Sequence, residues 1–217
     1  QRRKLLQGMT GLFLAERLGV LRNALAAGAK LPPPGIHRIN GQVTVNGRPA
    51  RPGMVINPGD SVSTGPASEA IYIIGNDAYL QRDNSTVSIA GNLLKSGLRV
   101  VNGKLLAVFG KGDKRIETPT ASIGIRGTGC YIEATPEKVY FCLCYGIADV
   151  TLAKDPEHIE TIQTRHHDHP VYLHADGSKM MVPAEVINHS DSELVLLESL
   201  VGRVPPFYGQ PENDRKY

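Results

Sequence analysis

Tryptophan is absent from this chain of 217 residues, and the other aromatic residues are few, with 8 Tyr and 4 Phe. No uncharged apolar stretch of about 18 residues occurs, which argues against a conventional membrane-spanning helix. Neither sign of charge dominates, because 24 Lys and Arg stand against 21 Asp and Glu. A net charge of +3 does not indicate a nucleic-acid surface, and we expect no nucleic-acid partner.

Apolar and turn-forming residues are plentiful. Hydrophobic residues make up 41% of the chain and charged residues 21%, which is ordinary for a chain that buries a core and excludes global disorder. The 23 Gly and 15 Pro indicate many turns between short elements. The composition therefore predicts a mostly β fold.

The sequence motifs of common enzyme classes are missing. We find neither the Gly-x-Ser-x-Gly elbow of serine hydrolases nor the His-Glu-x-x-His helix of zinc proteases. The glycine-rich run from Ile123 to Thr128 lacks the Gly-Lys-Ser/Thr ending of a phosphate-binding loop. We therefore expect that the protein is not an enzyme.

Residues 1–35 form a segment that we expect to be separate from the fold. Arg2-Arg3-Lys4-Leu5-Leu6 resembles the twin-arginine export motif, which would place the protein in the periplasm. The alternative is a retained amphipathic helix, in which residues 3–25 are a candidate for contact with a membrane surface or a partner. Its apolar positions are Leu5, Met9, Leu12, Phe13 and Leu21. Either alternative predicts an N-terminal helix that ends before Pro32.

Over residues 36–152 the pattern changes to short alternating apolar runs, beginning with a strand candidate at Ile39–Val45. Asn46-Gly47 is a strong hairpin signal, because both residues accept the positive φ of a type I′ turn, and Val101-Asn102-Gly103 repeats it. Further turn signals arrive at intervals of about six to twelve residues, which is typical of sandwiches, barrels and solenoids. We therefore predict one β domain over residues 36–152.

Several runs in this domain resemble the FecR family. The most specific run is Thr118–Thr128, with the sequence TPTASIGIRGT, and a Pro-Gly-Asp turn precedes it at Pro58–Asp60. The resemblance covers roughly residues 37–150 and implies a periplasmic, mostly β, solenoid-like or sandwich-like domain that binds another protein. Because we recognise no membrane-spanning helix or anti-sigma domain before residue 36, we expect a stand-alone sensor, adaptor or assembly subunit of an envelope or membrane complex.

The cysteines and a dense group of histidines are candidate metal ligands. Thiolate and imidazole are the groups that bind zinc, copper and iron–sulfur centres. The candidates are Cys130, Cys142, Cys144, His166, His167 and His169. In an extended segment His167 and His169 share a side, whereas His166 and His167 point opposite ways. The alternatives are buried thiols, or one disulfide among the three cysteines.

The register of the predicted hairpin decides which cysteines share a face. If the turn centres on Pro136, Cys130 lies opposite Cys142, on the face that also carries Cys144. If the loop is Ala134–Glu137, Cys130 faces away from the pair. The sequence leaves both registers open, and Cys142 and Cys144 share a face in either.

Residues 153–217 hold the histidines, a predicted helix and an extended tail. Ser190 and Glu193 match the N-cap and N3 positions of a capping box. The helix that follows has one apolar face and ends at Gly202, so we expect it to cap the β domain. That face consists of Leu194, Leu197, Leu200 and Val201. The first functional hypothesis is a non-enzymatic protein-binding module, and the second is a metal-binding or redox protein with a Cys/His site.

Overall fold

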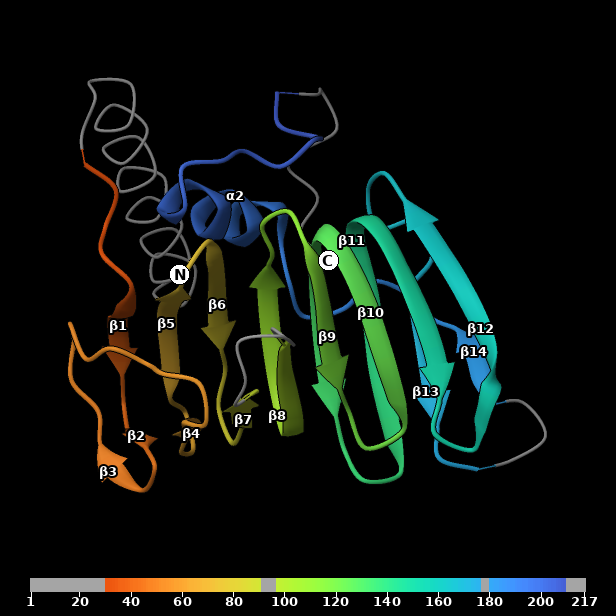
Figure 1. Ribbon diagram of the computed structural model, residues 1–217, viewed down its shortest axis with the longest axis horizontal. Helices are drawn as coiled ribbons and strands as arrows, with labels where there is room; N and C mark the ends of the chain where they lie inside the picture. The colour runs from red at the N-terminus through yellow and green to blue at the C-terminus, as the bar shows by residue number, and fades with distance from the viewer. Residues whose placement is uncertain (1–29, 91–96, 177–179, 210–217) are drawn as a thin grey trace, which may run out of the picture.

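The computed structural model describes residues 30–90, 97–176 and 180–209. The predicted helix within residues 1–29 and the tail beyond residue 209 lie outside the described residues. The described part consists of strands β1–β14 and the C-terminal helix α2 (Figure 1). None of its helices is both long enough and apolar enough to cross a bilayer.

The strands are short in the first third of the chain and longer in the middle. The first seven are β1 (Gly35–Asn40), β2 (Val43–Val45), β3 (Arg48–Pro49), β4 (Ser61–Thr64), β5 (Glu69–Ile74), β6 (Asp77–Gln81) and β7 (Thr86–Ile89). The others are β8 (Gly97–Val108), β9 (Asp113–Glu117), β10 (Ala121–Ala134), β11 (Lys138–Leu152), β12 (Asp155–Thr164), β13 (Val171–His174) and β14 (Met181–Pro183).

All these strands belong to one branched sheet of 14 strands. The first half of β8 pairs with β7 and β9, and its second half pairs with β6 and β10. The long strand β11 also branches, because one half pairs with β13 and the other with β12. Every pairing is antiparallel except that of β8 with β9. The predicted mostly β fold is therefore confirmed.

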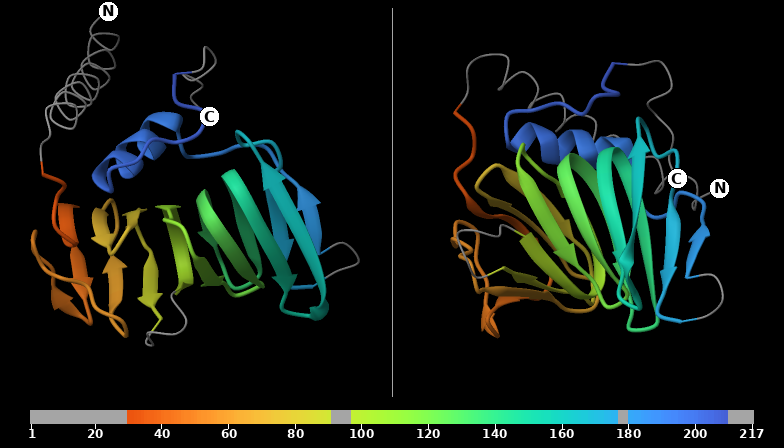
Figure 2. Two further views of the ribbon diagram at one scale, coloured as in Figure 1. Left: turned by 45° about the horizontal axis from the view of Figure 1, so that its top comes forward. Right: turned by 45° about the vertical axis from the view of Figure 1, so that its right-hand side comes forward.

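The sheet separates two apolar cores. The first core fills the inside of the folded sheet and includes Val62, Val87 and Ile123. The second lies on the other face, where side chains such as Leu106 and Tyr131 pack against α2. Figure 2 shows α2 across one end of the sheet, where it contacts β6 and β8. Helix α2 thus covers apolar surface that the sheet alone would leave in water.

Helix α2 spans Asp191–Leu200, as the capping box predicts. The backbone N–H of Ser190 donates to Glu193 Oε2 over 2.9 Å, and Arg82 donates to Glu193 Oε1 over 2.7 Å. The buried leucines are Leu194, Leu197 and Leu200. The prediction of a C-terminal capping helix is confirmed.

Two local predictions need correction. The strand expected at Ile39–Val45 is broken into β1 and β2 at Gly41, which has a φ of 76° and packs against Ser68. Asn46-Gly47 does form the β2–β3 turn, with φ of 52° and 74°. Gly103, the second such signal, lies inside β8 instead of in a turn. The same dipeptide therefore serves two different purposes in this chain.

Candidate metal centre

Two of the three cysteines lie on β11 and face α2. Cys142 and Cys144 are fully buried in the second core. Cys130 lies on β10 in the first core, on the other face of the sheet. The hairpin turn extends from Thr135 to Lys138, whose backbone groups bond over 2.9 Å, one residue further along than the second predicted loop. Cys130 pairs with Leu143 and faces away from Cys142 and Cys144, as that second alternative predicts, and the first register is wrong. The sheet therefore separates Cys130 from the other two thiols.

His167 reaches the same site from the loop between β12 and β13. Its backbone N–H donates to the carbonyl of Cys144 over 2.9 Å, and its φ of 54° turns the chain sharply. Asp168 holds this loop by accepting hydrogen bonds from the Thr164 hydroxyl (2.9 Å) and the Arg165 N–H (2.8 Å). The His167 side chain is 1% exposed.

His189 reaches the site from the segment that leads into α2. It directly precedes the N-cap residue Ser190 and is buried. Its ring stacks on Tyr131, with ring centroids 4.7 Å apart. The neighbouring Asn188 is tied to Glu133 by a hydrogen bond of 2.8 Å. The cluster therefore combines residues from strand β11, from the loop between β12 and β13, and from the segment that leads into α2.

One donor atom from each of four residues approaches a common point. Cys142 Sγ and His189 Nε2 lie 3.4 and 3.0 Å from His167 Nδ1. With Cys144 included, the four donor atoms lie within 4.8 Å of one another. In a tetrahedral zinc site, bond lengths of about 2.3 Å to sulfur and 2.05 Å to nitrogen place S···N pairs about 3.6 Å apart and N···N pairs about 3.3 Å apart. The two distances from His167 Nδ1 are close to these values, so the four residues form a candidate tetrahedral site.

Hydrogen bonds on the far side of each ring fix which nitrogen carries the proton. His189 Nδ1 lies 2.6 Å from the carbonyl of Ile187, which only accepts, so Nδ1 is the donor. His167 Nε2 lies 3.1 Å from a carboxylate oxygen of Asp191 and donates to it. In the neutral rings both facing nitrogens, 3.0 Å apart, then carry lone pairs. Two lone pairs at this distance need a shared cation, either a proton or a metal ion.

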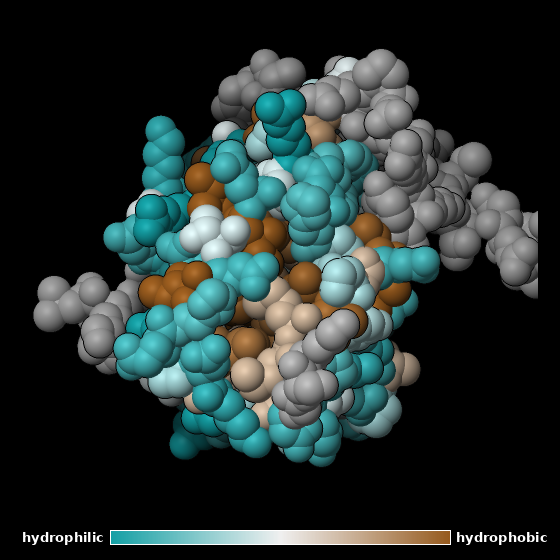
Figure 3. Space-filling model, turned by 90° about the vertical axis from the view of Figure 1, so that its right-hand side faces the viewer, coloured by the Kyte–Doolittle hydropathy of each residue, from teal (hydrophilic) through white to brown (hydrophobic). Residues whose placement is uncertain are grey.

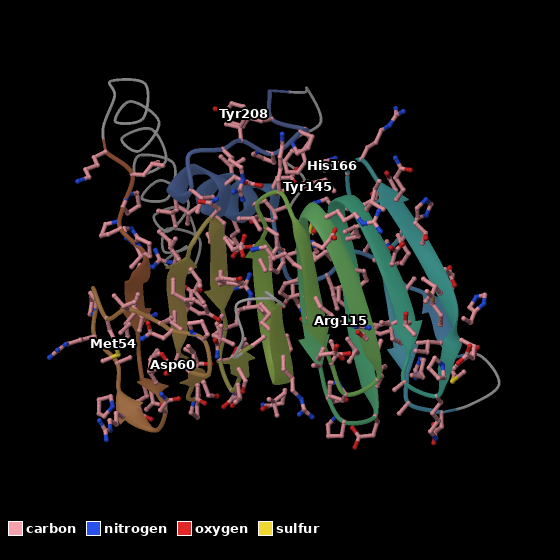
Figure 4. All side chains as sticks on the ribbon, viewed as in Figure 1. Met54, Asp60, Arg115, Tyr145, His166 and Tyr208 are labelled. Atoms are coloured by element: carbon pink, nitrogen blue, oxygen red, sulfur yellow. The ribbon has the colours of Figure 1, made fainter. Side chains whose placement is uncertain are left out.

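Asp191 holds two histidines at the edge of the cluster. Besides His167, it binds His166 Nε2, which lies 2.9 and 3.0 Å from its two oxygens. The ring of His166 also packs against Phe207, with centroids 4.5 Å apart. Figure 4 shows His166 and Tyr145 at the end of the sheet that α2 covers. A carboxylate bound to the outer nitrogen of a ligating histidine is a common outer partner in metal sites.

The electrostatics favour a thiolate beside a cationic or metal-bound ring. A hydrogen bond from Cys144 lowers the pKa of Cys142 well below its ordinary value, against burial, and His167 and His189 lower it further. Burial raises the pKa of Cys144 well above its ordinary value. Burial alone would lower the pKa of His167, but hydrogen bonds with Asp191 and Cys142 outweigh it and raise the pKa to about 9. The Cys142 thiolate, the His167 ring and the Asp191 carboxylate therefore form a row of alternating negative and positive charges.

Cys142, His167 and Asp191 are also arranged in the order of a cysteine nucleophile, its base and an orienting acid. Two observations oppose a catalytic role. Cys142 has no exposed surface, so a substrate does not reach its sulfur in this conformation. In addition, His189 lies closer to His167 Nδ1 than Cys142 does. The arrangement fits metal binding better than nucleophilic catalysis.

Of the six predicted ligands, the structure brings Cys142, Cys144 and His167 together. His166 lies beside the cluster on Asp191, whereas Cys130 lies in the other core and His169 is exposed. The fourth donor, His189, and the carboxylate Asp191 were outside the predicted set. The sequence feature that points to them is the predicted capping box, because His189 and Asp191 flank its N-cap residue Ser190 and are therefore fixed at the start of a helix.

Comparisons with known proteins identify no family for this chain. No protein-family model matches it, and no curated protein does. Two solved structures, each described as a "putative anti-sigma factor from Parabacteroides distasonis ATCC 8503", are similar to it with a TM-score of 0.48 and 8% sequence identity. The match covers 58% of this chain and 59% of those chains.

Proposed function

We propose that this protein is a metal-binding module in which Cys142, Cys144, His167 and His189 hold one zinc ion. The single observation that supports it is the convergence of four buried donor atoms within 4.8 Å. The two thiolates neutralise the charge of Zn²⁺, and the two rings bind as neutral ligands. Asp191 and the Ile187 carbonyl orient the rings from outside.

Zinc is the ion that this ligand set suits best. Two thiolates and two imidazoles in a tetrahedral arrangement are typical of structural zinc sites. Catalytic zinc sites keep one position open for water, whereas here four protein groups would fill all positions. We therefore propose a structural and non-catalytic role for the ion.

The test is the metal content of the purified full chain, measured by elemental analysis. We expect about one zinc per chain in the wild type, from the four-ligand stoichiometry of such sites. Cys142→Ser and His189→Gln should lose the ion. Cys130→Ser is the matched control, because it alters an equally buried thiol on the other face of the sheet and should retain the ion. Zinc retained by both site variants would contradict the proposal.

We propose, as a second function, that the module binds another protein in the periplasm, as its resemblance to FecR implies. The supporting feature is β12, which pairs with β11 on one side and with no other described strand. Ile159 on this strand is 60% exposed, and the register places it on the same face as Ile147, which is 37% exposed. Figure 3 shows this end of the molecule, where apolar side chains lie among hydrophilic ones. An unpaired edge with exposed apolar residues is a common place for strand addition by a partner.

Co-purification from the native host tests this second function. We expect a partner that wild type retains and Ile159→Lys loses. Val204→Lys serves as the control, because Val204 is 63% exposed beyond α2, and its neighbour Arg203 bonds to Asn76 between β5 and β6. A partner retained equally by both variants would place the interface elsewhere.

A further inference from the structure

The metal centre includes the residues at which helix α2 begins. His189 immediately precedes the N-cap, and Asp191 is the first residue of the helix. The remaining ligands belong to β11 and to the loop before β13. An ion held by all four ligands would therefore tie the start of the helix to the sheet.

Helix α2 is short, so it depends on contacts with the rest of the protein to stay in place. It has ten residues, and helices shorter than about 12 residues are marginal in water without tertiary contacts. Its buried leucines pack on the second core, and Arg82 binds Glu193 over 2.7 Å in a partly exposed pair. Near its end, Glu198 binds Tyr145 and Arg203. Of these contacts, the Arg82–Glu193 pair lies in the first turn, where Asn188 also bonds to Glu133, and the metal ligands would add the strongest link at this start of the helix.

We propose that zinc at the Cys/His cluster controls the docking of α2, so that the helix is fixed on the sheet with the ion bound and undocks when the ion leaves. This inference rests on the proposed metal centre. Without an ion, the cluster is still held by the contact of Cys142 with His167 and by the bond of Asp191 to His167, but His189 contacts the cluster only through the nitrogen that faces His167. The link between His189 and β11 is then weaker than coordination by four ligands.

Because the two cores lie on opposite faces of the sheet, the undocking of α2 would affect the second core and not the first. α2 packs on the second core, while the first core lies on the other face of the sheet and holds the strands together. Undocking would uncover an apolar face on β5, β6 and β8 and leave the sheet folded. The uncovered side chains are Ile71, Ile73, Leu80, Leu106 and Val108. Metal occupancy would thus switch an apolar surface between covered and open.

Amide hydrogen exchange on the full chain, with zinc bound and after chelation, tests the proposal. We expect the amides of residues 194–201 to exchange at least about ten-fold faster after chelation, while those of β8 and β10 keep their protection. Unchanged exchange in α2 after complete loss of zinc would overturn the coupling while leaving the metal centre intact. A purified chain that never binds zinc would overturn the metal centre itself.

Reciprocal linkage gives an independent test with variants. If zinc favours docking of α2, a change that weakens docking must lower zinc affinity. Leu197→Ala truncates a buried leucine of α2 and should weaken zinc binding by at least about ten-fold. Leu98→Ala is the matched control, because it truncates a buried leucine of the first core. Equal zinc affinity in wild type and Leu197→Ala would overturn the proposal, and the exchange measurement on wild type stands even if a variant fails to fold.

Discussion

Residues outside the ligand set decide how well the cluster can hold an ion. The carboxylate of Asp191 and the carbonyl of Ile187 each accept from the outer nitrogen of a ring, so the inner nitrogens of His167 and His189 face each other, and once the proton between them is released both carry lone pairs. The metal ion would then replace one shared proton without a rearrangement of the outer hydrogen bonds, which favours affinity. The stacking of His189 on Tyr131 fixes the plane of that ring as well.

Replacing Asp191 with Asn should weaken zinc binding by about 10–100-fold, because the His167 ring loses its charged outer partner. Competition with a chromophoric zinc chelator measures the affinity. His166→Ala is the control, because it removes the second partner of Asp191 and no proposed ligand. An unchanged affinity in Asp191→Asn, or a loss of zinc in His166→Ala, would contradict the assigned roles.

Asp60 gives a pH-dependent prediction at the other end of the molecule (Figure 4). The N–H of Asn57 and the side-chain amide of Asn46 donate to its carboxylate over 2.7 and 2.6 Å and hold its pKa below the usual value. A lowered pKa means stability that is present above the unfolded-state pKa of about 3.9 and is lost as the pH falls through the folded pKa.

Asp60→Ala should therefore lower the free energy of unfolding by about 1 kcal/mol near pH 7, at the modest end for a solvated group. Urea unfolding of wild type and variant should show the difference shrinking below about pH 4. Asp113→Ala, whose side chain is 97% exposed, is the control and should show little effect. A difference that grows toward low pH would contradict this account.

The candidate ligands show which parts of the site the residue pattern of the sequence could predict and which it could not. Cys142 and Cys144 could be placed together from alternation along a strand, since residues two apart share a face. His169 was expected beside His167 on the assumption of an extended segment, but the left-handed φ of 54° at His167 breaks the alternation. His189 lies 22 residues from His167, and only the packing of α2 brings it near.

At the scale of elements, local signals predicted turns and caps but not their tertiary setting. Asn46-Gly47 forms a hairpin because its neighbours pair with each other as β2 and β3. Gly103 also follows an asparagine, Asn102, but it lies inside strand β8 and allows that strand to pack closely against Ser85. Which outcome occurs depends on the partner strand, and that information lies elsewhere in the chain.

Gly103→Ala should destabilise the protein far more than Gly47→Ala. At Gly103, with a φ of 91°, a Cβ atom would lie 2.2 Å from Ser85 Oγ and 2.4 Å from its Cα, whereas no atom lies within 4 Å of one at Gly47. Both substitutions incur about 1–2 kcal/mol for the left-handed backbone, and overpacking adds about 1–3 kcal/mol at Gly103 only. Urea unfolding measures both, and equal losses would contradict the close packing of β8.

At the scale of the molecule, composition and periodicity predicted a mostly β protein with a helix at its C-terminal side. They did not predict that β8 and β11 each pair with different strands along their two halves. Long-range pairing of this kind depends on the two cores on opposite faces of the sheet. The same arrangement places two cysteines beside α2 and the third away from it.

The zinc coordination shell measured by X-ray absorption spectroscopy on the metal-loaded chain is the most direct test. We expect four ligands, with two sulfurs at about 2.3 Å and two nitrogens at about 2.05 Å, and the loss of one nitrogen contribution in His189→Gln if that variant retains any ion. A shell of oxygen and nitrogen without sulfur would contradict the account, because it would place the ion away from Cys142 and Cys144.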